Sequence, residues 1–258
     1  LLSLTHGIQA ETVVYTAKLI RTMEPALPEA TAVAVEDGKV LAVGSLDSLS
    51  PLITARGARI DRQFEDKVMT PGFIDPHVHP SLPAVLTQFP FLAPDDWYLP
   101  TGDFPGATTP EGYRSALQNL VAQHDDKSVP FIAFGYHPLW HGEVWRDDLN
   151  DWFGDTSVMI WHRSFHELIG NDAAWELLGV TKEDADAIHE GTNWERGHFY
   201  ELGLRAVFPH MGFLFEPKRY MGGMQNFLSM MHESGVTSST ATRGIATGPA
   251  GPLVVVVV

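Results

Sequence analysis

The segment Thr70–Pro80 (TPGFIDPHVHP) constrains this chain more than any other part of its sequence. A short apolar run there ends in two histidines, His77 and His79, that are two residues apart. Side chains at positions i and i+2 of a strand point to the same face, so both imidazoles can reach one ion. Neutral imidazole nitrogen is a ligand for Zn, Fe, Ni or Co. A bare His-x-His pair is nevertheless weak evidence for a metal, because an isolated pair more often binds none.

The absence of cysteine limits which side chains can complete such a site. Further ligands would have to come from His, Asp, Glu or a modified Lys. Asp75 precedes the two histidines and is a candidate for orienting one of them through a hydrogen bond. The absence of cysteine also excludes disulfides, iron–sulfur clusters and Cys nucleophiles.

The charge balance is strongly acidic, with 17 Lys and Arg against 32 Asp and Glu and a formal net charge of −15. A nucleic-acid partner is not expected, because phosphate binding requires a basic face. No membrane span is expected either, because no run of about 18 apolar residues occurs.

Residues 12–67 have the pattern of short strands and turns. Strands are expected at residues 12–15, 32–35 and 39–43. The last two flank Asp37-Gly38, which supplies the positive φ angles of a tight hairpin. We therefore expect residues 1–67 to form a small β-sandwich segment.

Residues 68–245 alternate between strands and helices, which predicts a parallel α/β sheet or barrel. Helices are expected at 109–124, 171–178 and 220–233, and strands at 131–136, 157–162 and 235–240. The acidic stretch Glu183–Glu195 is expected to be a solvated insertion. Residues 246–258, which end in five valines, are interpreted as a low-complexity tail, with a buried strand as the alternative.

The segment at residues 70–80 closely resembles the first-strand motif of the amidohydrolase superfamily. The upstream stretch, residues 22–44, resembles the split β-sandwich that flanks the barrel there. Further details are similar to the amidohydrolase-3 branch, which includes N-substituted formamide deformylases: Gly135-Tyr136, a histidine-bearing strand at 157–166, and Gly235-Val236-Thr237. The resemblance implies a partial TIM-type (β/α) barrel that is preceded by a β-sandwich segment.

The resemblance also implies an activity, the hydrolysis of C–N bonds in a small amide-type substrate. His77 and His79 would bind a divalent metal at the carboxyl end of the first barrel strand, where the active sites of such barrels lie. The metal would activate water and polarise the carbonyl group. Zinc is the default metal for imidazole ligands at a hydrolytic site.

Three further residues are candidates for substrate binding: His166, His162 and Tyr136. His166 resembles the histidine that follows the third strand in this branch. If the strand continues past residue 162, both histidines lie on one face. Tyr136 ends a strand, and its alternative role is packing against the following loop. Glu201 is another candidate, although a solvated helix position is expected for it.

The chain lacks several parts that the resemblance implies. The remaining metal ligands and the general-base Asp cannot be assigned and are expected beyond the C-terminus. The chain is therefore interpreted as an N-terminal fragment of a metal-dependent amidohydrolase. The alternatives are a catalytically inactive fragment, which at most binds metal or self-associates as a homo-oligomer through open sheet edges, and a complete smaller binding domain. Residues 1–10 resemble the end of a signal peptide, so both a cytoplasmic and an exported location stay open.

Overall fold

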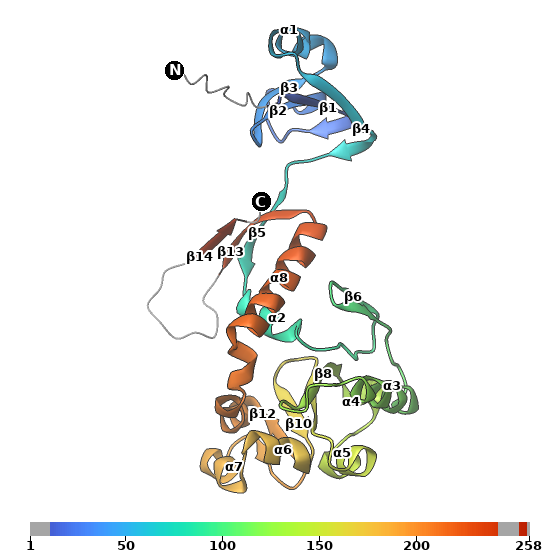
Figure 1. Cartoon of the computed structure of the whole chain (residues 1–258), viewed down its shortest axis with the longest axis vertical. Coiled ribbons are helices and arrows are strands. Elements are labelled where there is room, and N and C mark those ends of the chain that lie inside the picture. The colour runs from blue at the N-terminus through green and yellow to red at the C-terminus, as the bar shows by residue number, and fades with distance from the viewer. Residues whose placement is uncertain (1–10, 242–252, 257–258) are drawn as a thin grey trace, which may run out of the picture. The chain divides into compact units, whose positions relative to one another are not determined.

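A computed structural model describes residues 11–241 and the backbone of residues 253–256 (Figure 1). The described residues divide into two compact units, with the division between Phe73 and Ile74. The stretch at residues 1–10 that resembles a signal peptide lies outside the described ranges. Within those ranges, no helix has the length and apolar character needed to cross a membrane.

The first unit is a four-stranded sheet with one helix. The sheet has the strand order β3-β2-β1-β4, in which β1 pairs antiparallel with β2 and parallel with β4. The elements are β1 (Val13–Arg21), β2 (Glu29–Glu36), β3 (Lys39–Gly44), α1 (Leu46–Arg56) and β4 (Arg59–Met69). Its small core joins Val14, Ala32 and Ala34 of the sheet to Leu49 of α1.

The predicted hairpin between β2 and β3 is confirmed. Asp37 and Gly38 have φ angles of 52° and 70°. Positive φ at both central residues is the geometry whose twist matches a two-residue hairpin.

Helix α1 corrects the prediction that residues 12–67 hold only strands and turns. The Ser45 side chain accepts the Ser48 backbone N–H at 3.2 Å, and the Ser48 side chain accepts the Ser45 backbone N–H at 2.9 Å. Gly57 ends the helix in the left-handed conformation, with φ 59°. Pro51 lies inside the helix. Proline is unfavourable in the interior of a helix, so the sequence pattern did not indicate a helix here.

The second unit contains the histidine-bearing segment and three sheets. Its elements are β5 (Phe73–Val78), α2 (Ser81–Leu86), β6 (Trp97–Leu99), β7 (Gly102–Phe104), α3 (Pro110–Ala122), β8 (Phe131–Tyr136), α4 (Pro138–His141), α5 (Arg146–Phe153), β9 (Val158–His162), β10 (Glu167–Gly170), α6 (Asp172–Leu178), α7 (Lys182–Ile188), β11 (Thr192–Asn193), β12 (His198–Tyr200), the 3-10 helices η1 (Glu201–Ala206), η2 (Phe208–His210) and η3 (Gly212–Phe215), α8 (Pro217–Glu233), β13 (Val236–Ala241) and β14 (Leu253–Val256).

Several of these elements form where the sequence predicts them. Helix α3 has Thr109 as its N-cap and Pro110 in its first turn, and it buries Tyr113 and Leu117. Helix α6 begins after the N-cap Asn171 and ends at Gly179. Strands β8, β9 and β13 and helix α8 also overlap their predicted ranges. Local caps and apolar periodicity are sufficient to define these elements.

The main sheet of the second unit is mixed, which corrects the prediction of a parallel sheet. Its order is β11-β12-β10-β9-β8. Only β8 and β9 are parallel, and the other pairs are antiparallel. A separate sheet has the order β14-β13-β5, so part of the expected low-complexity tail forms a strand. The described residues form no closed barrel.

Alternating side chains divide the core of the second unit between the two faces of the main sheet. Ile132 and Phe134 of β8 join one cluster together with residues of α2, α6 and the 3-10 helices. Phe131 and Ala133 join the other cluster, which includes residues of α3 and α5. This period of two is the pattern of a strand buried on both faces. Packing on both faces fixes the position of β8, and hence of the polar residues that directly follow it.

Helix α2, which follows the two histidines, and the two residues after it are anchored to the middle of the long helix α8 and to η3. The Thr87 hydroxyl donates to the Gly223 carbonyl at 3.0 Å. The Asn226 amide donates to the Thr87 carbonyl at 3.2 Å, and the Gln88 amide donates to the Leu214 carbonyl at 3.0 Å. These bonds hold the segment after His79 against α8 and η3.

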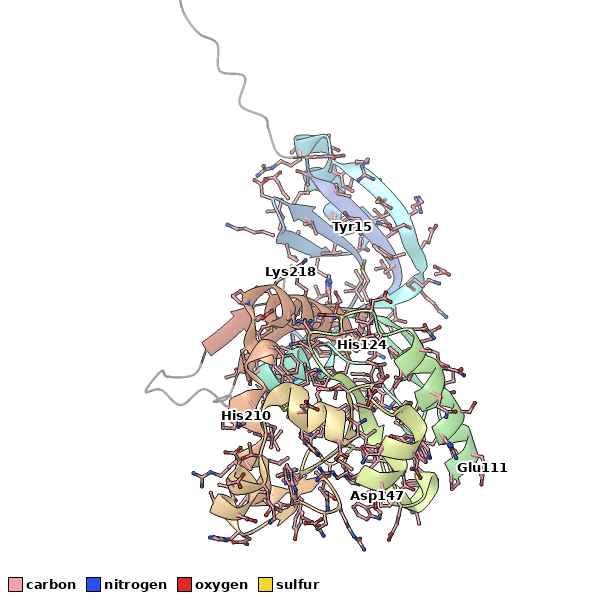
Figure 2. All side chains as sticks on the ribbon, turned by 60° about the horizontal axis from the view of Figure 1, so that its bottom comes forward. Tyr15, Glu111, His124, Asp147, His210 and Lys218 are labelled. Atoms are coloured by element: carbon pink, nitrogen blue, oxygen red, sulfur yellow. The ribbon has the colours of Figure 1, made fainter. Side chains whose placement is uncertain are left out.

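The acidic stretch Glu183–Glu195 is not the solvated insertion that was expected. It contributes most of α7, whose Ala185 is 1% exposed and belongs to the core. His210, which Figure 2 labels, donates through Nδ1 to the Leu178 carbonyl at 3.1 Å, and its Nε2 lies 3.7 Å from Asp184 Oδ2. Its acidic side chains are largely exposed, while the helix packs through Ala185 and Ile188.

Candidate functional site

His77 and His79 converge at the end of β5. Their Nε2 atoms are 3.2 Å apart, and their ring centroids are 5.1 Å apart with planes at 73°. Both residues are exposed. Asp75 Oδ1 accepts the His77 backbone N–H at 3.0 Å, so this carboxylate shapes the backbone around the pair. The i and i+2 spacing therefore brings the two nitrogens together, as expected for a strand.

The separation of these nitrogens fits a shared metal ion. Two nitrogens 3.2 Å apart, each ~2.0–2.1 Å from a zinc ion, would subtend about 100° at the metal, close to the tetrahedral angle. The same separation also suits a direct N–H···N hydrogen bond. Among the described residues, no group of three or more His, Asp or Glu side chains could hold a metal. The described part of the chain thus offers two ligands of the three that a catalytic metal usually has.

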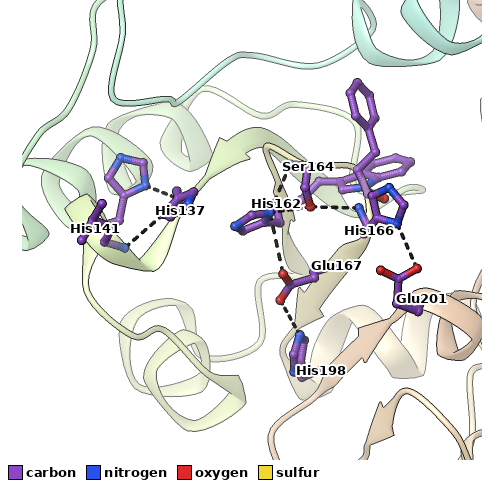
Figure 3. A network of polar contacts seen from close by, with 11 residues as sticks. His137, His141, His162, Ser164, His166, Glu167, His198 and Glu201 are labelled. Atoms are coloured by element: carbon purple, nitrogen blue, oxygen red, sulfur yellow. Dashed lines mark hydrogen bonds and ion pairs between the residues drawn. The ribbon is translucent and has the colours of Figure 1, made fainter.

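A second polar cluster lies at the carboxyl end of β9 (Figure 3). The Ser164 backbone N–H donates to His162 Nδ1 at 3.1 Å, and the Ser164 hydroxyl lies 2.7 Å from the same nitrogen. The strand ends at His162 and returns as β10. This turn corrects the expectation that a continuing strand aligns His162 with His166.

The turn nevertheless keeps both predicted histidines in one polar network. The His166 backbone N–H donates to the Ser164 hydroxyl at 3.3 Å. His166 Nδ1 donates to Glu201 Oε2 at 3.0 Å, and both side chains are largely exposed. Glu201 begins a 3-10 helix with φ 47°. It therefore contacts a candidate site residue, in a position that the sequence suggested was merely solvated.

Glu167 links two histidines from different strands. His198 Nε2 donates to Glu167 Oε2 at 2.9 Å, and His162 Nδ1 lies 3.8 Å from Glu167 Oε1. Burial lowers the pKa of His198 and of His162, and the Glu167 carboxylate opposes this shift at both rings. Both histidines are accordingly poised as neutral hydrogen-bonding groups near neutral pH.

His137 and His141 extend the cluster toward β8. The His137 and His162 ring centroids are 4.9 Å apart. His141 Nδ1 accepts the His137 backbone N–H at 3.1 Å, so its Nε2 carries the proton and donates to the Ala107 carbonyl at 2.8 Å. Burial lowers the pKa of His141 to about 4. His141 is thus a neutral structural group that fixes the loop after β8.

Tyr136 also contributes structure at this strand end. Its hydroxyl donates to the Gly142 carbonyl at 2.8 Å and accepts the Val144 backbone N–H at 3.1 Å. The residue is 3% exposed, and burial raises the pKa of its phenol to about 12. The structure places the predicted substrate residue beside His162, with its ring 6.1 Å away, and its hydroxyl on the loop.

Sequence analysis missed Glu167, His198 and the role of His141. Glu167 and His198 are 31 positions apart and meet only because β10 pairs with β12. The one local signal was the run His162-Arg163-Ser164-Phe165-His166-Glu167, whose density of polar groups directly after a buried strand indicates a strand-end cluster.

The fold is similar to that of two solved structures, each described as an uncharacterized metal-dependent hydrolase. The structure from Pyrococcus horikoshii OT3 matches with a TM-score of 0.64 and 19% identity, over 89% of this chain and 42% of that chain. The structure from Pyrococcus furiosus matches with a TM-score of 0.61 and 17% identity, over 88% and 43%. The chain therefore has the α/β fold of part of such proteins. At these identities the likeness establishes the fold alone.

A relative with higher sequence identity is the exoenzymes regulatory protein AepA of Pectobacterium carotovorum subsp. carotovorum. It is 33% identical in an alignment of 239 residues, and the alignment covers 88% of this chain and 48% of that protein. The chain thus spans about half the length of the curated relative that it matches. No protein-family model matches the sequence.

Proposed function

We propose that the chain is the N-terminal part of a metal-dependent hydrolase that cleaves C–N bonds in a small amide-type substrate. In this proposal β5, β8, β9 and β13 are the first strands of a TIM-type barrel that the rest of a longer protein completes. His77 and His79 provide two of the metal ligands. The observation that carries the proposal is the 3.2 Å separation of their Nε2 atoms at a strand end.

When bound, a divalent metal such as zinc would lower the pKa of a water molecule and polarise the substrate carbonyl group. The residues of this chain then have two tasks. His77 and His79 would hold the ion. His166, oriented by Glu201, and His162, oriented by Ser164, present imidazole groups at the end of β9 that can hydrogen-bond the substrate.

Metal affinity tests this proposal in the chain itself. We expect the purified chain to bind one zinc ion, measured by competition with a chromophoric chelator near neutral pH. His77→Ala and His79→Ala should each weaken zinc binding at least about tenfold, because each removes one imidazole ligand. His232→Ala is the matched control, because His232 is exposed on α8 outside the site, and its zinc affinity should be unchanged.

Zinc affinity that is unchanged in both site variants would contradict the proposal. It would favour the alternative of a chain without a metal function, in which His77 and His79 merely hydrogen-bond one another. A second measurement follows amide hydrolysis in the longer protein that the proposal implies. There we expect the same two substitutions to abolish turnover.

A further inference from the structure

A cleft of about 710 Å³ lies at the amino ends of β8 and β9, away from the strand ends that carry Tyr136 and His162. Its walls come from the loop between α3 and β8, from the end of α5 and the segment that leads to β9, and from the first two turns of α6. Clefts that bind small molecules have volumes of about 300–1,000 Å³. This cleft therefore has room for a small organic molecule and is much larger than a single ion needs.

Two asparagines hold the walls of the cleft in place. Asn171 is fully buried and is the N-cap of α6. Its Oδ1 accepts the Val158 backbone N–H at 3.0 Å, and its amide donates to the Thr156 carbonyl at 2.8 Å. On the other side, Asn150 Oδ1 accepts the Asp172 backbone N–H at 3.0 Å, and the Asn150 amide donates to Asp172 Oδ2 at 3.1 Å. These bonds tie the segment before β9 and the end of α5 to the start of α6, so the cleft is formed without a ligand.

The lining of the cleft carries an excess of negative charge. It includes the carboxylates of Asp155, Asp172 and Glu176. Asp172 is paired with Arg146, whereas the carboxylates of Asp155 and Glu176 are exposed and form no hydrogen bond or ion pair with any described residue. Lys127 alone supplies a positive charge among the described lining residues, and its ammonium group donates to a backbone carbonyl. The cleft therefore favours a cationic ligand over an anionic one.

The lining also has more hydrogen-bond acceptors than donors. His124 Nε2 donates to the Val129 carbonyl at 3.1 Å, which leaves Nδ1 of the neutral ring as an acceptor. Ser157 Oγ is shielded from solvent and has no hydrogen-bond partner among the described residues. A buried hydroxyl without a partner is rare in native proteins and indicates that a ligand or a water molecule completes its hydrogen bonds. A ligand with several N–H donors would complement this lining.

A metal ion is a poor match for the cleft. In the part of the chain that the structure describes, no group of three or more His, Asp or Glu side chains could hold one. Carbon surface is also part of the lining, from Val129, Ala173 and Leu177. An alkyl chain can contact such a surface while an ammonium group at its end stays beside a carboxylate, as a lysine side chain does.

We propose that this cleft binds an aliphatic diamine. Its two ammonium groups match the two carboxylates, those of Asp155 and Glu176, for which the described residues supply no counterion. Each ammonium group has three N–H donors and no acceptor, which complements a lining rich in acceptors. The inference is independent of the proposed hydrolase, because none of the lining residues belongs to that site.

The test is the binding of 1,4-diaminobutane, with 1,4-butanediol as the neutral ligand control, measured by calorimetry at low ionic strength, where screening is weak. The chain should bind one diamine, at least about tenfold more tightly than the diol, because the diol forms neither ion pair. Glu176→Gln and Asp155→Asn should each weaken diamine binding about threefold or more, since each removes one exposed ion pair.

Matched controls separate this site from the general attraction of an acidic chain for cations. Glu233→Gln and Asp103→Asn remove the same charges from exposed positions outside the cleft, and their diamine affinity should be unchanged. Amide NMR shifts induced by the diamine should be largest around residues 155–157 and 172–177. Equal affinity for diamine and diol, or equal losses in the site and control variants, would overturn the inference.

Two further measurements complete the test. Magnesium ions at concentrations that leave the ionic strength unchanged should not displace the diamine, and stoichiometric displacement would contradict the proposal by showing a metal site instead. Diamine binding should also be the same in His77→Ala as in the wild type, because the cleft does not include the paired histidines. Diamine binding that is lost in His77→Ala would place the ligand at the histidines and refute the cleft.

Discussion

At the scale of single residues, the histidines at the end of β5 differ in burial from those around the end of β9. His77 and His79 are exposed, and their Nε2 atoms lie 3.2 Å apart. His162 and His198 are largely buried and are held by Glu167 and by neighbouring backbone groups. Exposed imidazoles can exchange a proton for a metal ion, whereas buried neutral imidazoles are better suited to hydrogen-bonding a substrate.

His141 gives the clearest pH dependence. Its pKa is lowered by burial to about 4 from the ordinary value of 6.5, so the folded state binds its proton less readily than the unfolded state. Its contribution to stability is therefore complete above pH 6.5 and is lost as the pH falls toward about 4. We expect the unfolding free energy to fall over this window by up to about 1.4 kcal/mol per pH unit from this residue.

Urea titrations across this pH window measure the effect. His141→Gln retains a donor and an acceptor without a titrating ring. The variant should therefore take up about one proton fewer on unfolding within this window, and its unfolding free energy should depend less on pH. An identical pH dependence in the variant and the wild type would show that His141 is not the titrating group.

At the scale of elements, a helix or strand can be predicted from sequence when its own residues define where it begins and ends. Helices α3 and α6 carry their own caps, Thr109 and Asn171, and could be placed from sequence. The return of the chain as β10 was missed, because a four-residue strand has no periodicity to detect and depends on pairing with β9 and β12. The same distinction applies to the polar residues: the approach of His77 to His79 follows from their i, i+2 spacing, while the Glu167–His198 contact depends on the pairing of β10 with β12.

The packing of α8 on α2 depends on one of two adjacent glycines. A Cβ atom at Gly223 would lie 1.8 Å from the Ala84 carbonyl oxygen, whereas one at Gly222 would have no atom within 4 Å. Gly223→Ala should therefore destabilise the chain by about 2 kcal/mol or more through forced separation of the helices. Gly222→Ala should be neutral or stabilise it by up to about 1 kcal/mol, because alanine favours the helix.

Thermal and urea unfolding of the two glycine variants decides this point. Equal stability of the two would mean that α2 and α8 do not approach one another at Gly223, and the anchoring of the segment after His79 would then need another explanation.

At the scale of the whole molecule, the described residues supply part of the proposed metal site, and the chain matches part of two longer proteins. It has two imidazoles at one strand end and, among its described residues, no third ligand group around them. The chain matches 42% and 43% of the two solved hydrolase structures. Composition excluded thiolate metal sites, and no further metal ligand can be assigned among the described residues.

X-ray absorption at the zinc edge of the zinc-loaded chain tests most directly whether one ion bridges His77 and His79. We predict a nitrogen and oxygen shell at ~2.0–2.1 Å, with multiple scattering from two imidazole rings in the wild type and from one in His79→Ala. A spectrum without imidazole scattering, or one identical in the two proteins, would contradict the metal site on which the account is built.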